Sequence, residues 1–166
     1  LYFQEPGVAE AEFERDIRMC LKKFLVLGGG ETDLASLPVK GEHDDMFSNM
    51  PEPETLPKWL TEADLDFFVE EFSRSGLRGP LNYYRNHDLY WELTSNAPTT
   101  IRQPAMYVAG TNDGVVMMAA AGIEMMPHFV TDLRINRMIP GIGHWTQQEA
   151  PGAVNELILD FLKQID

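Results

Sequence analysis

Residues 104–114 read PAMYVAGTNDG, and this stretch decides the fold class of the chain. Its first seven residues form a short, almost unbroken apolar run, which is typical of a parallel strand that is buried on both faces. The TNDG that follows predicts a turn at the carboxyl end of that strand. We therefore expect a parallel sheet in this part of the chain, with Asp113 in the loop after its first strand.

The residues after this stretch continue an alternation of helices and strands. A helix is expected over about 115–126, and the sequence LRINRMI over 133–139 predicts a second strand. A Gly-rich turn, PGIGHW, comes next. A last helix is expected to begin near Pro151, because apolar residues then recur along one stripe. Strand, helix, strand and helix in succession predict an α/β architecture with a parallel sheet.

The residues upstream of Pro98 are expected to form helices and loops only. Apolar residues at helical spacing predict one helix over about 9–27, which ends at the glycines 28–30. These glycines lack the GxGxxG spacing of a phosphate-binding loop, so we interpret them as a helix stop. Residues 31–58 are rich in Pro, Gly and acidic side chains, and they predict a long surface loop.

Two further helices are predicted in this region. Thr61 and Asp64 resemble a capping pair that starts one helix. The next helix follows Pro80, which suits a first helical turn, and runs through LNYYRNHDLYWEL. The sequence therefore predicts two regions, a helical one over 1–97 and an α/β one over 98–166.

Composition excludes several classes of partner. The chain has 166 residues, of which 44% are hydrophobic, and its formal net charge is −13. This negative charge repels phosphate backbones and anionic membrane surfaces, so nucleic acid is not expected as a partner. No run of eighteen apolar residues predicts a membrane span, and the single cysteine, Cys20, cannot form an internal disulfide. We expect a cytoplasmic protein and keep a homodimer as an open alternative for its oligomeric state.

Two polar residues follow the predicted strands at their carboxyl ends, where functional groups gather in open α/β sheets. They are Asp113 after the first strand and His144 after the second. Each alone has an ordinary structural explanation, because NDG is a turn sequence and single histidines are common in folded domains. Together, in the order Asp then His, they match the acid and base of an α/β-hydrolase triad.

Four sequence blocks add a family resemblance that covers essentially the whole chain. They are LYFQEPGVAEAE, EFSRSGLRGPLNYYRN, VAGTND and GIGHWTQQEAPGAVNELILDFL. In this order they resemble the carboxyl-terminal half of a soluble epoxide hydrolase of the α/β-hydrolase fold. The resemblance implies a helical cap over 1–97, followed over 98–166 by the carboxyl-terminal β-α-β-α part of a mostly parallel sheet.

The resemblance also implies that part of the catalytic machinery lies elsewhere. In the family, an aspartate nucleophile and an HGxP oxyanion loop lie upstream of the cap, and one of two ring-polarising tyrosines falls just before the equivalent of Leu1. The chain contains neither HGxP nor a GxDxG-like turn. We therefore expect it to be part of a longer polypeptide, and the missing amino-terminal half to be its partner in forming the site.

The resemblance assigns a role to one tyrosine of this chain. Tyr84, in NYYRN, would donate a hydrogen bond from the cap to the oxygen of the opening epoxide. The family commonly has Trp where this chain has Tyr83. We choose Tyr84 because it directly precedes Arg-Asn, as in the family motif. Neighbouring residues of a helix also point about 100° apart, so the two tyrosines cannot share one task.

The other implied roles belong to the second region. His144, oriented by Asp113, would activate the water that hydrolyses an aspartyl-ester intermediate. Val116 and Trp145 would line an apolar pocket for a small apolar epoxide. No metal and no organic cofactor are implied.

Two other functions stay open at this point, and the second half of the chain argues against a third. A haloalkane or haloacid dehalogenase shares the fold, the nucleophile and the Asp-His pair, but Tyr84 argues against it. A non-catalytic ligand binder of the same fold would need neither Asp113 nor His144. A stand-alone cap or interaction module would leave two parallel strands with exposed apolar faces and edges.

Overall fold

The structure is a computed structural model that describes residues 5–39, 41, 44–47 and 49–165. The LYFQ at the start of the first family block lies outside the described residues. The chain divides into two compact units: Leu1–Val26 with Leu37–Ala97, and Leu27–Ser36 with Pro98–Asp166. Residues 27–36, which the sequence places in the helical region, thus make their contacts within the second unit.

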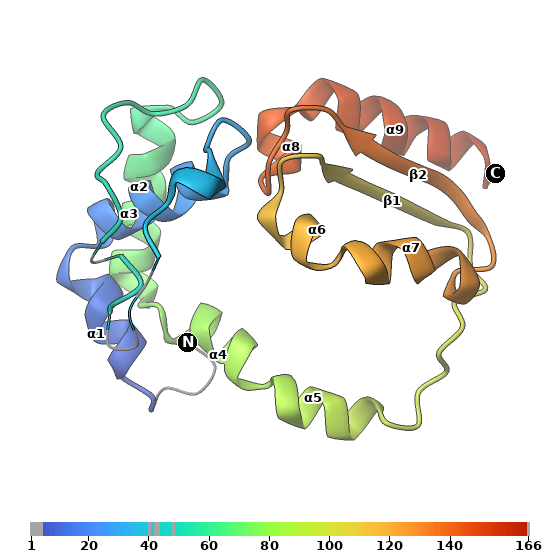
Figure 1. The fold of residues 1–166 in the computed structure, drawn as a ribbon, viewed down its shortest axis with the longest axis horizontal. Coiled ribbons are helices and arrows are strands. Elements are labelled where there is room, and N and C mark those ends of the chain that lie inside the picture. Colours follow the sequence, from blue (N-terminus) through green and yellow to red (C-terminus); the bar gives the residue numbers. More distant parts are fainter. Residues whose placement is uncertain (1–4, 40, 42–43, 48, 166) are drawn as a thin grey trace. The chain divides into compact units, whose positions relative to one another are not determined.

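The first unit consists of helices and loops, as predicted (Figure 1). Thr61 and Asp64 form the predicted capping pair at the start of α3, since each backbone N–H donates to the side chain of the other, at 2.9 Å from Thr61 and 3.2 Å from Asp64. The helices are α1 (Val8–Arg15), α2 (Ile17–Gly28), α3 (Glu62–Ser75), α4 (Arg78–Arg85) and α5 (His87–Thr94).

The single helix predicted over 9–27 is wrong, because the chain leaves the helical conformation at Asp16. This residue has φ −150° and ψ 85°, and its Oδ1 accepts a hydrogen bond of 2.9 Å from the N–H of Met19. An aspartate that satisfies the first N–H groups of a following helix favours a new helix start over continuation. The helix predicted after Pro80 is likewise divided, at Asn86.

The loop predicted over 31–58 is not confined to the surface, because Phe47 is buried in the core of the first unit. Its ring meets that of Phe13 edge to face, with centroids 5.0 Å apart. Its N–H donates to Glu12 Oε1 at 2.8 Å, and its carbonyl accepts from Lys23 Nζ at 3.2 Å. Side chains of α1 and α2 thus satisfy the backbone of a loop residue that composition alone places in solvent.

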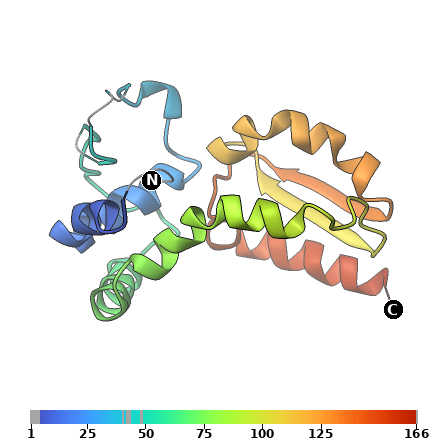
Figure 2. The same cartoon turned by 90° about the horizontal axis from the view of Figure 1, so that it is seen from below.

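The second unit contains the predicted parallel sheet. Strands β1 (Ala105–Gly110) and β2 (Leu133–Ile139) pair in parallel. Helices α6 (Gly114–Met118) and α7 (Ala120–Phe129) lie on one face of these strands, and α9 (Pro151–Lys163) lies on the other (Figures 1 and 2). The remaining elements are η1 (Leu34–Ser36) and α8 (Thr146–Glu149).

Two details of this unit differ from the prediction. The helix expected over 115–126 is interrupted at Ala119, where the chain turns between α6 and α7. Strand β1 is not buried on both faces, since Met106, Tyr107 and Val108 are only half-buried. In the described residues, β1 pairs with β2 alone. The other edge of β1 therefore has no neighbouring strand that would help to bury its side chains.

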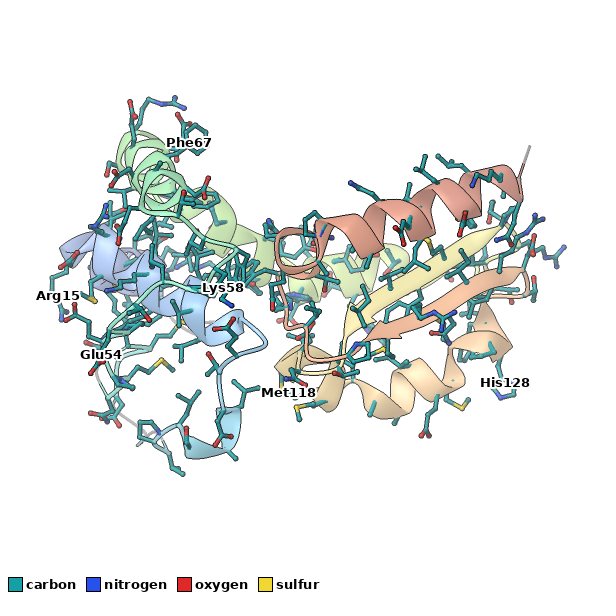
Figure 3. The ribbon with its side chains drawn as sticks, turned by 90° about the horizontal axis from the view of Figure 1, so that it is seen from above. Arg15, Glu54, Lys58, Phe67, Met118 and His128 are labelled. Atoms are coloured by element: carbon teal, nitrogen blue, oxygen red, sulfur yellow. The ribbon has the colours of Figure 1, made fainter. Side chains whose placement is uncertain are left out.

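Some large apolar side chains remain exposed on each unit. Phe67 lies on the outer side of α3 in the first unit, and Met118 lies at the end of α6 in the second (Figure 3). Single exposed apolar residues of this kind are common on folded proteins. Within the described ranges, no helix combines the length and apolarity needed to cross a bilayer.

Candidate active site

The loops after β1 and β2 bring Asp113 and His144 together. Because the strands are parallel, their carboxyl ends meet at the same edge of the sheet. Asp113 follows β1 as the N-cap residue of α6, and His144 follows β2 after the turn at 140–143. Nδ1 of His144 lies 3.0 Å from Oδ2 of Asp113. Two residues that are 31 positions apart in sequence thus form a hydrogen-bonded pair.

Burial distinguishes the two members of this pair. The side chain of Asp113 is only 9% exposed, whereas that of His144 is 44% exposed. The second oxygen of Asp113, Oδ1, accepts a 2.8 Å hydrogen bond from the N–H of Val115. When Nδ1–H of the imidazole donates to this fixed carboxylate, Nε2 keeps its lone pair and can accept a proton. The pair can therefore serve as a general base with access to water.

Glycines allow residues 28–30 to pass close to the loop that carries His144. The N–H of His144 donates to the carbonyl of Gly28 at 2.7 Å. A Cβ on Gly143 would lie 2.3 Å from the nitrogen of Gly30, and a Cβ on Gly110 would lie 2.0 Å from the carbonyl oxygen of Ile142. The predicted helix stop is confirmed, because α2 ends at Gly28. The same glycines also provide the space in which residues 28–30 contact this loop.

The carboxylate of Glu149 joins these two segments, and the sequence analysis did not single it out. Its Oε2 accepts the N–H groups of Gly30 and Gly143, both at 2.9 Å. Its Oε1 accepts the N–H of Trp145 at 3.1 Å. All three donors are backbone groups, which carry no residue-type signal, so the only possible clue in the sequence was the position of Glu149 five residues after His144.

Val116 and Trp145, the predicted pocket residues, both lie in the second unit. Val116 is half-buried in α6. The ring of Trp145 lies edge to face with that of His144, with centroids 5.1 Å apart, and its indole packs against Gly28. Their role in binding a substrate stays a prediction.

A cavity of about 370 Å³ lies in the same unit. This volume is within the range of small-molecule sites. Neither Val116 nor Trp145 is among its lining residues. The cavity is lined by Gly30, Glu31, Thr32, Asp33, Leu34, Ala35, Asn112 and Met117.

Within the described part of the chain, no three His, Cys, Asp or Glu side chains are grouped so that they could hold a metal ion.

Tyr84 belongs to the first unit, on α4. It is 37% exposed, whereas its neighbour Tyr83 is 76% exposed. Their rings meet edge to face with centroids 5.8 Å apart. The two tyrosines thus differ in their surroundings, as the 100° turn between helical neighbours requires.

An ion pair fixes the helix that carries Tyr84. Arg85 forms two hydrogen bonds with the carboxylate of Glu10 in α1, at 2.6 and 2.7 Å. Glu10 also accepts the N–H of Gly7 at 2.8 Å. The hydrogen bond with Arg85 is the largest cause that lowers the pKa of Glu10 from 4.5 to about 2. Both side chains of the pair are largely buried, so α4 is attached to α1 by a charge-assisted contact.

Comparison with curated proteins identifies relatives along the whole chain, although no protein-family model matches it. The chain is 36% identical to epoxide hydrolase A of Mycobacterium tuberculosis over 171 residues, which cover all of this chain and 52% of that protein. It is also 36% identical to the bifunctional epoxide hydrolase 2 of Sus scrofa over 164 residues, which cover 98% of this chain and 29% of that protein. The chain thus spans about half the length, or less, of these relatives.

Solved structures give the same result for the fold. An epoxide hydrolase from an endophytic Streptomyces superposes with a TM-score of 0.91 at 38% identity, covering 99% of this chain and 51% of that one. Epoxide hydrolase A from Mycobacterium thermoresistibile superposes with a TM-score of 0.86 at 38% identity, covering 98% of this chain and 50% of that one.

Proposed function

The chain belongs to the epoxide hydrolases of the α/β-hydrolase fold, and on this premise we propose that the complete protein converts epoxides into vicinal diols. One observation carries the proposal: relatives named epoxide hydrolase match the chain over its whole length, including the loops that hold Asp113 and His144. The relatives are about twice as long or longer. We therefore propose that an amino-terminal half supplies the nucleophilic aspartate and the second tyrosine.

The first proposed step opens the epoxide ring. The carboxylate of the nucleophile attacks one ring carbon, the carbon–oxygen bond breaks, and an ester forms. The released oxygen gains negative charge, which Tyr84 and the second tyrosine stabilise by donating hydrogen bonds and a proton. The ion pair between Arg85 and Glu10, which holds α4, supports this role because a donor must be positioned before charge develops.

The second proposed step hydrolyses the ester. Nε2 of His144 takes a proton from water while Nδ1–H donates to Asp113, and the resulting hydroxide attacks the ester carbonyl. Collapse of the tetrahedral intermediate breaks the ester carbon–oxygen bond, and the leaving alkoxide takes the proton from His144 to complete the diol. The proton left on the restored aspartic acid returns to the deprotonated tyrosine, so the nucleophile is again a carboxylate. The 3.0 Å distance in the Asp113–His144 pair and the exposure of the imidazole support this assignment. Neither step requires a metal ion or an organic cofactor.

We further propose a small apolar epoxide as the substrate, with Val116 and Trp145 in its pocket. Residues 1–97 would form the cap and 98–166 the carboxyl-terminal part of the core. A dehalogenase of the same fold is the second candidate, and the names of the relatives favour epoxide hydrolysis over it. Cytoplasmic location and a homodimer stay predictions from the sequence.

Replacement of His144 by glutamine tests the function in the complete protein. Ring opening does not use His144, so His144→Gln should still form the ester but hydrolyse it slowly. Intact-protein mass spectrometry after exposure to an epoxide should then show a covalent adduct with the mass of the epoxide. His128→Gln, at the exposed end of α7, is the matched control and should turn over normally (Figure 3). A wild-type protein that hydrolyses epoxides while His144→Gln never accumulates an adduct would contradict the assigned role.

A further inference from the structure

We infer that Glu149 is a positioning residue for ester hydrolysis, because its carboxylate fixes the backbone on both sides of His144. We call the contact between Glu149, Gly30 and Gly143 the glycine latch. The inference rests on the proposed function, in which His144 is the base. It goes beyond that function, because it assigns a role to a residue whose carboxylate bonds to backbone N–H groups around His144 and to neither member of the Asp113–His144 pair.

The hydrogen bonds of Glu149 surround His144 in the sequence. Gly143 and Trp145, the residues before and after His144, donate their N–H groups to the two oxygens of the same carboxylate, at 2.9 and 3.1 Å. The N–H of His144 itself donates to Gly28 at 2.7 Å. Three successive backbone N–H groups are therefore held in place. The direction of the imidazole then depends on this backbone and on Asp113.

The third donor connects a distant segment to the same carboxylate. The N–H of Gly30 donates to Oε2 of Glu149 at 2.9 Å, across 119 positions of sequence. A Cβ on Gly30 would lie 2.3 Å from the carbonyl oxygen of Gly141 and 2.6 Å from the nitrogen of Gly143. The backbones are thus in direct contact on one side, and the carboxylate bonds to both. A single oxygen shared by Gly30 and Gly143 fixes the distance between the two segments.

Charge makes a carboxylate suited to this position. Three N–H groups point at this side chain, and each of them needs a hydrogen-bond acceptor. An ionised carboxylate presents acceptor oxygens and no donor. An amide at position 149 would keep the shape but would place an NH₂ group against one of the N–H donors. The glutamine variant should therefore weaken the latch, and the alanine variant should remove it. Gly30→Ala perturbs it from the opposite side by steric contact.

The test uses the complete protein and separates the two chemical steps. Rapid-quench single-turnover experiments with an aryl-substituted epoxide give the rate of ester formation and the rate of ester hydrolysis. A displacement of about 1 Å in a catalytic group costs roughly a hundredfold in rate. We expect hydrolysis to slow about a hundredfold in Glu149→Ala and Gly30→Ala and about tenfold in Glu149→Gln. Ester formation should stay within about twofold, because it does not use His144.

Matched variants provide the controls. Glu156→Gln removes an exposed carboxylate from α9, and Gly152→Ala adds a methyl group where nothing lies within 4 Å. Both should keep wild-type rates. A purely structural role for Glu149 predicts a lower melting temperature with an unchanged ratio of the two rates, and that result would overturn the inference. If Glu149→Ala does not fold, Glu149→Gln and Gly30→Ala decide in the same way. Failure of the wild-type protein to form an ester would overturn the proposed function together with the latch.

Discussion

The substitution Asp113→Asn separates two tasks that one carboxylate performs. Oδ1 of Asp113 caps α6 by accepting the N–H of Val115 at 2.8 Å, and Oδ2 faces Nδ1 of His144 at 3.0 Å. Asparagine has one side-chain oxygen and can keep only one of these contacts. If the oxygen caps the helix, the NH₂ group donates to Nδ1 and forces the imidazole proton onto Nε2. That tautomer cannot accept a proton from water.

The expected magnitudes follow from these contacts. Loss of an N-cap typically costs about 1 kcal/mol of stability, whereas asparagine is as good a cap as aspartate. The wrong histidine tautomer costs about 10⁴-fold in the step that uses the base. We therefore expect Asp113→Asn to hydrolyse the ester about 10⁴-fold more slowly with little change in the free energy of unfolding. Asp113→Ala should show a similar loss of rate and a stability lower by about 1 kcal/mol.

Two measurements on the complete protein check this expectation. Single-turnover kinetics give the rate of ester hydrolysis, and urea denaturation gives the free energy of unfolding. Asp160→Asn, on the exposed side of α9, is the control for loss of a carboxylate. If Asp113→Asn hydrolyses the ester within tenfold of the wild-type rate while α6 stays capped, Asp113 does not orient His144 and the reasoning is refuted.

Two further predictions concern the first unit. Tyr84→Phe should raise the barrier to ring opening by roughly 3 kcal/mol, which slows this step about a hundredfold, and should leave ester hydrolysis unchanged. Tyr83→Phe should change the rate of ring opening little in the same rapid-quench assay. If Tyr83→Phe instead slows ring opening more than Tyr84→Phe, Tyr83 is the donor. Glu10→Gln should lower the free energy of unfolding by about 2 kcal/mol at pH 7, because the hydrogen bond with Arg85 holds the pKa of Glu10 near about 2. That stability is present above the ordinary pKa of 4.5 and is lost as the pH falls towards about 2. The free energies of unfolding of variant and wild type, measured by urea denaturation, should therefore converge near that pH. A difference that persists there would contradict the ion-pair explanation.

The strands and the last helix could be predicted because their apolar patterns are local. The run PAMYVAG and the sequence LRINRMI became β1 and β2, and Pro151 begins α9. The sequence did not predict the helix interruptions at Asp16, Asn86 and Ala119, because the apolar spacing continues across these residues although the helical backbone conformation ends there. Such breaks depend on capping and on the packing of neighbouring elements, which periodicity does not encode.

The candidate site divides in the same way. Asp113 and His144 could be predicted because each follows a strand at its carboxyl end, and the geometry of a parallel sheet does the rest. Phe47 and Glu149 could not, because Phe47 bonds to Glu12 across 35 positions, and Glu149 bonds to backbone N–H groups, one of which lies 119 positions away. The glycines 28–30 were interpreted only as a helix stop for the same reason. Their contact with Gly143 depends on how the chain returns to that loop, and no local pattern records it.

The bond between Gly30 and Glu149 also bears on the order in which the chain folds. It closes a loop of 119 positions, and the entropy of closing such a loop costs roughly 4 kcal/mol before any contact within it is counted. Contacts of this range form slowly unless nearer ones have already shortened the path between their ends. The pairing of β1 with β2 and the docking of α9 onto β2 involve much smaller separations. We therefore expect the histidine loop to reach its final position late in folding, after the sheet that carries it has formed.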